Sequence, residues 1–341
     1  MKKIFIGIDF SKLKFDVAIF DSQKSEIIAS NVLENTLVGF NSLLKWVSSI
    51  VEERKEDWLF CGEHTGLYSL NLSIFLRASE IDIWLESGLQ IKLSQGIKRD
   101  KTDKVDASHI AKYAFRHQDK VKLFEPKSKI IDGIKDLLMH RDRLVEAKKG
   151  FLIASKELRR FKTDNNAVDY IFEDSESIIN SLKSKIKACE NKINDLISDD
   201  SELLKNYKLL LSINGIGLVN AVMVLSITAN FTLFTDARKF GCYCGVVPFK
   251  HNSGTSIKGR TKVSQIANKK VKALLTQAAR TSVLHDAEIR SYYERKRAEG
   301  KPDRVVINNI RNKIIHRMFA VVQSGIEFDV NYLHPLKQQA A

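Results

Sequence analysis

The sequence predicts an α/β domain with a mixed sheet, followed by a mainly helical remainder. Over the first 126 residues, short apolar segments alternate with amphipathic ones, which is the pattern of a sheet covered by helices. From about Ser128 to Ile197 the chain is almost free of Gly and Pro, and its apolar residues are spaced as in long helices. We therefore expect a boundary near Pro126 and domains over residues 1–126, 127–200 and 201–341.

The expected elements of the first domain follow from these short segments. Residues Leu37 to Glu53 have helical spacing, and a second helix is expected from Ala107 to His117, before Pro126. The strands are expected at Ile4–Ile8, Phe15–Phe20, Glu26–Leu33, Trp58–Cys61 and Ile81–Leu85. Beyond Pro126 we expect an antiparallel pair of long helices, broken near Thr163 to Ala167 and able to pair with another protomer.

Charge and its distribution favour a polyanionic partner. The chain holds 55 Lys and Arg against 41 Asp and Glu, a formal net charge of +14, so at neutral pH it is attracted to phosphates. From Phe249 to His285 there is no Asp or Glu. This basic block predicts a nucleic-acid surface rather than a solvated face. Its expected contact residues are Lys250, Lys258, Arg260, Lys262, Lys269 and Lys270.

The remaining composition points to a cytoplasmic protein. The 4 cysteines show neither a disulfide framework nor zinc-ligand spacing. The chain starts with a short strand candidate rather than a signal peptide, and no apolar run is long enough to span a bilayer. We expect no membrane contact and a reducing compartment.

Four carboxylates are candidates for one metal site. Asp9 and Glu63 each follow a short apolar strand, and Asp103 and Asp106 are three residues apart at a helix start, so both can face the sheet edge. Close carboxylates repel one another unless a cation neutralises them, and oxygen ligands suit Mg²⁺ or Mn²⁺. Spacing alone leaves two alternatives open. Asp100 is in phase with Asp103 and Asp106, and acidic residues at a helix start also stabilise the helix dipole.

Three motifs around these carboxylates resemble those of one enzyme family. The segments are GIDFSK (7–12), GEHTG (62–66) and KTDKVDA (101–107). They are similar to the DEDD motifs of transposases with a RuvC-like, RNase H-type domain, a family that includes pilin-gene invertases and bridge-RNA-guided insertion-sequence recombinases. The resemblance implies that Asp9, Glu63, Asp103 and Asp106 are catalytic residues that bind metal.

A second part of the same family's pattern lies in the basic block. The segments GVVP (245–248), KHNSGTS (250–256) and KGR (258–260) resemble the C-terminal transposase domain, in which a serine before a glycine is the nucleophile. The resemblance assigns this role to Ser253, with Ser256 as the second candidate. From spacing alone, both serines could simply belong to a polar loop shaped by Gly254.

A glycine turn precedes the basic block. The segment INGIG (213–217) lies between two apolar helix candidates and resembles a helix-hairpin-helix, in which backbone N–H groups of the turn approach phosphate. We therefore expect Gly215 and Gly217 to contact nucleic acid. A tight turn between two packed helices is the structural alternative.

These motifs predict a transposase or site-specific recombinase that cuts and rejoins donor and target DNA through a phosphoserine intermediate. The resemblance also implies a structured guide RNA, and strand exchange between two duplexes implies a homo-oligomer, a dimer or tetramer. Besides a nucleic-acid binder without catalysis, two rivals with a different activity remain open at this point. One is a RuvC-like junction nuclease without serine chemistry. The other is an actin-like ATPase, against which stands the lack of a glycine-rich phosphate turn in residues 10–14.

Overall fold

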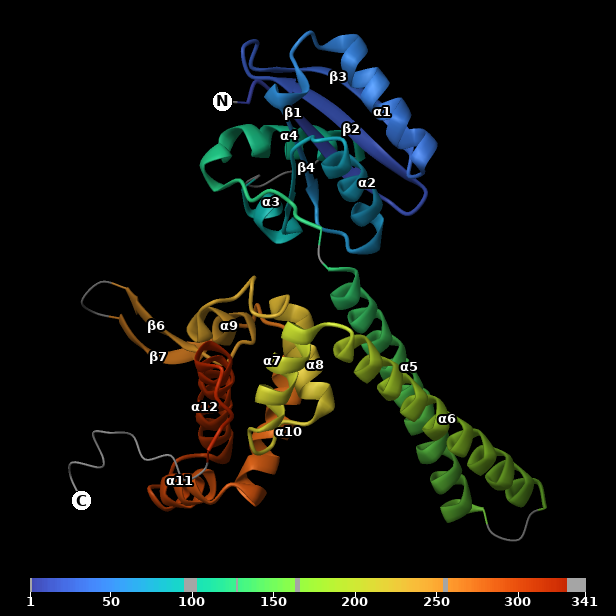
Figure 1. Cartoon of the computed structure of the whole chain (residues 1–341), viewed down its shortest axis with the longest axis vertical. Helices are drawn as coiled ribbons and strands as arrows, with labels where there is room; N and C mark the ends of the chain where they lie inside the picture. The colour runs from blue at the N-terminus through green and yellow to red at the C-terminus, as the bar shows by residue number, and fades with distance from the viewer. Residues whose placement is uncertain (1, 95–102, 127, 163–165, 254–256, 330–341) are drawn as a thin grey trace. The chain divides into compact units, whose positions relative to one another are not determined.

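The computed structural model describes residues 2–94, 103–126, 128–162, 166–253 and 257–329, with side chains except at 103–104, 250–253 and 257–260. The chain forms two compact units, Met1–Pro126 and Lys127–Ala341, so the long helices and the C-terminal part belong to one unit (Figure 1). Each unit is described by itself.

The first unit is built on a five-stranded mixed sheet in the order β3-β2-β1-β4-β5. β1 pairs antiparallel with β2, which pairs antiparallel with β3, whereas β1, β4 and β5 are parallel. This is the RNase H-like α/β fold that the sequence predicted. The strands are β1 (Ile4–Phe10), β2 (Lys14–Asp21), β3 (Glu26–Glu34), β4 (Trp58–Glu63) and β5 (Ile83–Glu86).

Helices cover both faces of this sheet (Figure 1). Even-numbered residues of β1 pack in one core with α1 (Leu37–Ile50) and α2 (Leu67–Ala78). The opposite face, which includes Phe5, packs against α3 (Gly88–Ser94) and α4 (Asp103–Arg116). Short 3-10 turns, η1 (Lys55–Asp57) and η2 (Gln118–Lys120), complete the unit. Neither α2 nor α3 is among the helices expected from the sequence.

Small side chains allow α4 to lie directly on the sheet. Gly7 is level with Ala18 on β2 and Cys61 on β4. A Cβ atom on Gly7 would lie 2.2 Å from the carbonyl oxygen of Ala107 and 2.3 Å from the backbone nitrogen of Ala111. The backbone of α4 therefore rests on this point of β1, and any larger side chain there would push the helix away.

A substitution at this contact should lower stability strongly. Gly7→Ala forces a methyl group into backbone atoms of α4, and we expect the free energy of unfolding to fall by about 2–3 kcal/mol in urea denaturation. Gly150→Ala is the matched control, because a Cβ at Gly150 in the long helix that opens the second unit would meet nothing within 4 Å. In a helix interior that change should raise stability by about 0.5–1 kcal/mol. Equal effects at the two glycines would contradict the packing of α4 on Gly7.

The second unit begins with two long antiparallel helices, α5 (Lys129–Phe161) and α6 (Asn166–Ser198). They are joined across their interface by an ion pair in which Arg141 Nε lies 2.8 Å from Glu190 Oε1. Of the break expected near Thr163 to Ala167, residues 163–165 lie outside the described residues, whereas Asn166 and Ala167 already belong to α6. Their length and pairing agree with the helical spacing of the sequence.

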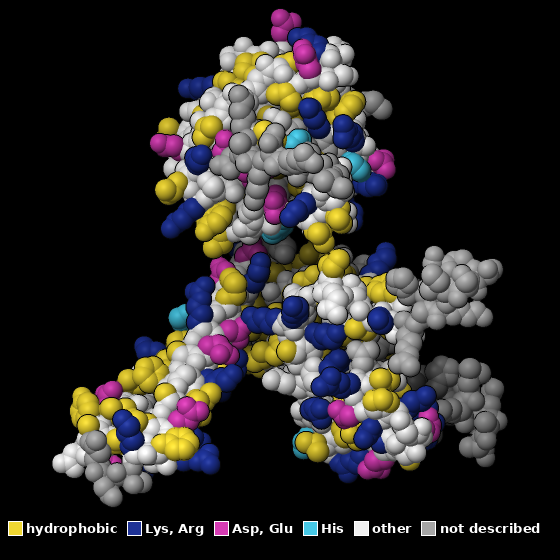
Figure 2. All heavy atoms as spheres, turned by 180° about the vertical axis from the view of Figure 1, so that it is seen from behind, with side chains coloured by type: hydrophobic (Ala, Val, Ile, Leu, Met, Phe, Trp, Pro, Cys, Tyr) yellow, Lys and Arg dark blue, Asp and Glu magenta, His cyan; other side chains and the backbone are white. Residues whose placement is uncertain are grey.

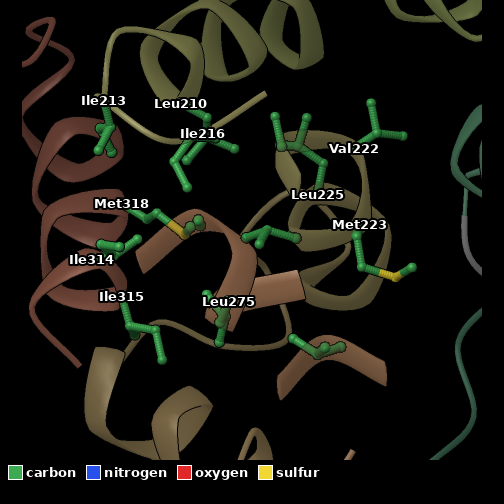
Figure 3. Packing of buried hydrophobic residues seen from close by; sticks show 14 of the residues in the cluster. Leu210, Ile213, Ile216, Val222, Met223, Leu225, Leu275, Ile314, Ile315 and Met318 are labelled. Atoms are coloured by element: carbon green, nitrogen blue, oxygen red, sulfur yellow. The ribbon is translucent and has the colours of Figure 1, made fainter. Parts of the chain in front are cut away.

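The C-terminal part of this unit is a helical bundle that carries one β-hairpin (Figure 1). The hairpin is formed by β6 (Pro248–Ser253) and β7 (Ile257–Val263), which pair antiparallel. Figure 3 shows apolar side chains of the bundle converging in its core, among them Leu210, Leu275 and Met318. The helices are α7 (Ser201–Leu211), α8 (Leu218–Thr228), α9 (Ala237–Tyr243), α10 (Lys269–His285), α11 (Ala287–Ala298) and α12 (Asp303–Ser324). No helix among the described residues has the length and apolar character needed to cross a membrane.

Candidate active site

Asp9 and Glu63 lie side by side at the carboxyl ends of two parallel strands. The register of β1 and β4 pairs Ile8 with Gly62, so Asp9 and Glu63 are the next residues on the two strands. Ile8 and Phe10 belong to the core on the α1 side of the sheet, which places Asp9 on the opposite, α4-covered face. Cys61 belongs to the core on the α4 side, so Glu63 shares that face with Asp9.

The first turn of α4 lies over the same end of the sheet. Phe5 packs against Phe115 with ring centroids 5.4 Å apart, near the end of α4, whereas Gly7 meets Ala107 and Ala111. Residues further along β1 therefore meet residues nearer the start of α4. Asp106 and the start of the helix at Asp103 lie toward the Asp9 end of the strand. α4 begins four residues earlier than predicted, so Asp103 and Asp106 both belong to the helix itself. Asp100, the alternative candidate, lies outside the described residues.

Two further carboxylates extend this arrangement. Asp16 stands directly opposite Asp9 in the antiparallel pair of β1 and β2, and it is 7% exposed. Glu86 is level with Glu63 in the parallel pair of β4 and β5. Asp16, Asp9, Glu63 and Glu86 thus form a carboxylate row across four neighbouring strands. Sequence reasoning missed Asp16 and Glu86, although Glu86 follows an apolar run just as Asp9 does.

The outer members of the carboxylate row have partners. Asp16 lies 3.7 Å from Lys14 Nζ. Glu86 accepts hydrogen bonds from the backbone N–H of Ser87 at 2.7 Å and from the Tyr113 hydroxyl at 3.4 Å. The Glu63 carboxyl lies against the start of α3, since a Cβ on Gly88 would be 1.9 Å from Glu63 Oε1. These contacts fix both ends of the row.

An open groove borders Glu86. It has a volume of about 670 Å³ and is lined by Trp84, Glu86, Tyr113, His117 and other residues of β5, α3 and α4. The Tyr113 ring stacks on His117 with centroids 4.4 Å apart. Burial and then the charge of Glu86 raise the pKa of Tyr113 to about 12.

This pKa gives a test of the carboxylate row at its outer end. Glu86→Gln removes one cause of the shift, so the pKa of Tyr113 should fall below about 12 while burial keeps it above its usual value. The measurement is absorbance of tyrosinate during alkaline titration, with Tyr113→Phe used to identify the signal. Because the folded-state pKa is raised, Tyr113 stabilises the fold below its unfolded pKa, and that stabilisation is lost as the pH rises toward 12. An unchanged titration in Glu86→Gln would contradict the contact.

The donor chemistry suits a hard divalent cation. Carboxylate oxygens are ligands for Mg²⁺, which commonly uses one or two carboxylates together with substrate phosphates and water. Thr65 Oγ1, two residues beyond Glu63, is buried and has no hydrogen-bond partner among the described residues. Among those residues, no three His, Cys, Asp or Glu side chains are gathered closely enough to hold one ion. The side chain of Asp103 is outside that description.

Ser253 is the last residue of β6, where it pairs with Ile257 of β7. The structural alternative was a polar loop shaped by Gly254, and Ser253 is the residue at which the strand pairing reaches that segment. Gly254 and Ser256 lie outside the described residues, as do the side chains of Ser253, Lys250, Lys258 and Arg260. Ser253 is thus at the tip end of a two-stranded projection rather than within the helical bundle.

The two glycines of the turn between α7 and α8 have different surroundings. Gly215 has a φ of +96°, and a Cβ there would lie 2.2 Å from Ser282 Oγ of α10. The hydroxyl of Ser282 donates to the carbonyl of Asn214 at 2.6 Å. Gly215 is therefore required by packing on α10. At Gly217, which precedes α8, a Cβ would meet nothing within 4 Å, so of these two glycines only Gly217 has open space beside it.

The described members of the basic surface are exposed. Figure 2 shows Lys and Arg side chains gathered over the C-terminal helices, with few Asp or Glu side chains between them. Lys262 and Lys269 are exposed, and Lys270 forms an ion pair with Asp142 of α5. Lys270 is thus partly neutralised within the unit, whereas Lys262 and Lys269 present their charge to solvent.

The first unit combines an RNase H-like sheet with acidic residues near the carboxyl ends of β1 and β4, and comparison with known proteins identifies the class of protein. Residues 6–152 match the DEDD transposase model of the IS110 type, and residues 207–294 match the model described as "Transposase IS116/IS110/IS902 family". The chain belongs to this transposase family.

Two individual proteins are similar to parts of the chain. A Streptomyces coelicolor protein named "Insertion element IS110 uncharacterized 43.6 kDa protein" is 27% identical over 155 residues, which cover 45% of this chain and 38% of that protein. The match thus spans well under half of that relative. A solved structure of T. thermophilus RuvC in complex with a Holliday junction substrate aligns over 36% of this chain and 99% of that chain, with 12% identity and a TM-score of 0.26.

Proposed function

We propose that this protein is the transposase of an insertion sequence, which cuts and rejoins DNA at the carboxyl ends of β1 and β4. The observation that carries the proposal is the placement of Asp9 beside Glu63 on the face covered by α4, within a region matched by the DEDD transposase model. The strongly basic C-terminal part supports a nucleic-acid substrate.

In this proposal Asp9, Glu63, Asp103 and Asp106 hold Mg²⁺ or Mn²⁺ together with the scissile phosphate. Ions held by these carboxylates would supply Lewis-acid polarisation of the phosphodiester and would stabilise charge on its attacking and leaving oxygens. Asp9 and Glu63 are fixed by β1 and β4, and Asp106 is carried by a helix whose backbone rests on Gly7. The protein therefore holds the carboxylates on rigid elements before the substrate binds.

Ser253 is the proposed nucleophile. Its Oγ attacks phosphorus and forms a phosphoserine, the bond from phosphorus to one deoxyribose oxygen breaks, and that oxygen takes up a proton. Attack on the phosphoserine by a DNA hydroxyl reverses these steps and reseals a strand without ATP. The position of Ser253 at the end of a hairpin suits a group that must approach DNA, and a homo-oligomer can supply several such serines.

A structured guide RNA is the proposed source of sequence choice. A basic surface reads backbone and shape, and base pairing with RNA can supply specificity that the protein lacks. A RuvC-like nuclease without serine chemistry is the competing function, because the acidic site alone can cut DNA.

The experiment that tests the proposed function offers the protein donor and target DNA with its candidate guide RNA and Mg²⁺. Rejoined recombinant products that require both RNA and Mg²⁺ are expected. Cut DNA without rejoined products would favour the nuclease, and intact DNA under all conditions would contradict both functions.

A further inference from the structure

Two cations from different helices lie near one turn of the C-terminal unit. Lys272 lies in α10, and its Nζ is 3.7 Å from the position that a Cβ would take on Gly245. Arg311 lies in α12, where its Nη1 donates to Asn308 Oδ1 at 3.2 Å. Asn308 Nδ2 in turn donates to the carbonyl of Val246 at 2.8 Å. Lys272 thus lies at the Gly245–Val246 turn, just before β6, and Arg311 is linked to the same turn through Asn308.

These two cations differ from their neighbours in lacking an acidic partner. Arg280 is paired with Asp303, Lys313 with Glu288, and Arg317 with both Asp286 and Glu288. Within the described part of the chain, no Asp or Glu forms an ion pair with Lys272 or Arg311. Burial and then the charge of Arg311 lower the pKa of Lys272, and burial and then the charge of Arg280 lower the pKa of Arg311.

The Nε–H group of Arg311 is a hydrogen-bond donor without an acceptor among the described residues. This nitrogen is buried. Leaving such a donor unpaired costs about 1–3 kcal/mol, and two close cations repel each other as well. An anion placed between the two groups would remove both costs together.

We propose that Lys272 and Arg311 form a binding site for one phosphodiester group of a nucleic-acid backbone. A guanidinium presents a planar pair of donors that matches two phosphate oxygens, and an ammonium adds a mobile charge beside it. The inference rests on the proposed function, since it needs a nucleic-acid substrate, and it adds a contact outside the acidic site and the β-hairpin.

The place of this site in the fold defines its role. β6 begins at Pro248, two residues after Val246, and ends at Ser253. The five steps along the extended strand from Pro248 to Ser253 span about 17 Å. The phosphate held by Lys272 and Arg311 is therefore not the one that Ser253 attacks. The two cations are positioning residues that fix the backbone at the foot of the hairpin.

The first test measures binding of the full-length protein to labelled duplex DNA and, separately, to RNA across a salt series. Lys272→Met and Arg311→Met should each weaken binding about tenfold and reduce the slope of log affinity against log salt by about one. Lys313→Met is the matched control, because it removes one positive charge from α12 at a residue already paired with Glu288. It should leave the slope unchanged. A loss confined to DNA or to RNA identifies which backbone the site holds.

The second test separates binding from a structural role. Because Lys272 and Arg311 repel each other, Lys272→Met should raise the melting temperature of the free protein by roughly 2 °C. Arg311→Lys keeps the positive charge but removes the planar pair of guanidinium donors. It should therefore restore part of the affinity that is lost in Arg311→Met. The inference is overturned if both Met variants bind with wild-type affinity and with the wild-type slope of log affinity against log salt. It is also overturned if Lys272→Met lowers the melting temperature. Either result leaves the proposed function intact. A wild-type protein that binds neither nucleic acid would instead overturn the proposed function.

Discussion

Asp9→Asn should reduce metal-dependent DNA cutting by about a thousandfold or more. The substitution keeps the size of the side chain but removes a charge from the pair formed with Glu63. Metal ions contribute several kcal/mol of transition-state stabilisation, and about 4 kcal/mol corresponds to a factor of roughly 10³ in rate. The measurement is single-turnover cutting of donor DNA at saturating protein.

The control for this prediction is a carboxylate close to the same sheet but outside the acidic site. Glu56→Gln changes an exposed carboxylate just before the start of β4, away from Glu63, and should leave cutting unchanged. Glu63→Gln should match the loss of Asp9→Asn, and the double variant should cut no more slowly than either single variant because both residues act on one site. Additive losses would indicate that the two carboxylates act independently.

Ser253→Ala should abolish the covalent protein–DNA product and lower recombination by at least about 10⁴-fold. Removing the attacking oxygen leaves no group that can conserve the phosphodiester bond energy, and loss of a nucleophile has effects of this size in other enzymes. The measurement is a denaturing gel of protein–DNA adducts together with counts of rejoined products.

Ser256→Ala is the matched control, since it removes the second candidate hydroxyl near the same hairpin. It should retain the adduct. Adduct formation by Ser253→Ala together with its loss in Ser256→Ala would transfer the nucleophile to Ser256. Cutting that survives in both variants without any adduct would favour the metal-dependent nuclease.

The sheet and its two acidic strand ends were predictable because the signal is local. Each of β1 and β4 is a short apolar run ended by a carboxylate, and apolar runs of this length define strands. The close contact of α4 with Gly7 was not predictable. It depends on Gly7 lying next to Ala18 and Cys61 on the neighbouring strands, and that placement follows from strand register. Strand register also explains why Asp16 and Glu86 were not predicted as members of the carboxylate row. Asp16 lies within an apolar strand, and only the register places it opposite Asp9. Glu86 is level with Glu63 only because β4 and β5 pair in this register.

In the C-terminal unit the sequence predicted helices but missed the β-hairpin. Residues 248–263 are rich in Lys, Gly and Ser and show no apolar alternation, so the sequence signal of a half-buried strand is missing there. The expected contact of Gly215 with phosphate stays a prediction, and the close approach of this glycine to Ser282 could not be predicted because it depends on the packing of α10. Lys272 and Arg311 lie near one turn only because α10 and α12 pack together, which no local pattern reveals.

The most direct test of the acidic site replaces Mg²⁺ by Fe²⁺ in the protein–DNA complex and maps where hydroxyl radicals, generated with ascorbate and peroxide, cut the polypeptide. Breaks are expected around Asp9, around Glu63 and at the start of α4, and all three should disappear together in Asp9→Asn. Breaks confined to other segments, in a protein whose DNA cutting still requires the metal, would contradict a metal site at the ends of β1 and β4.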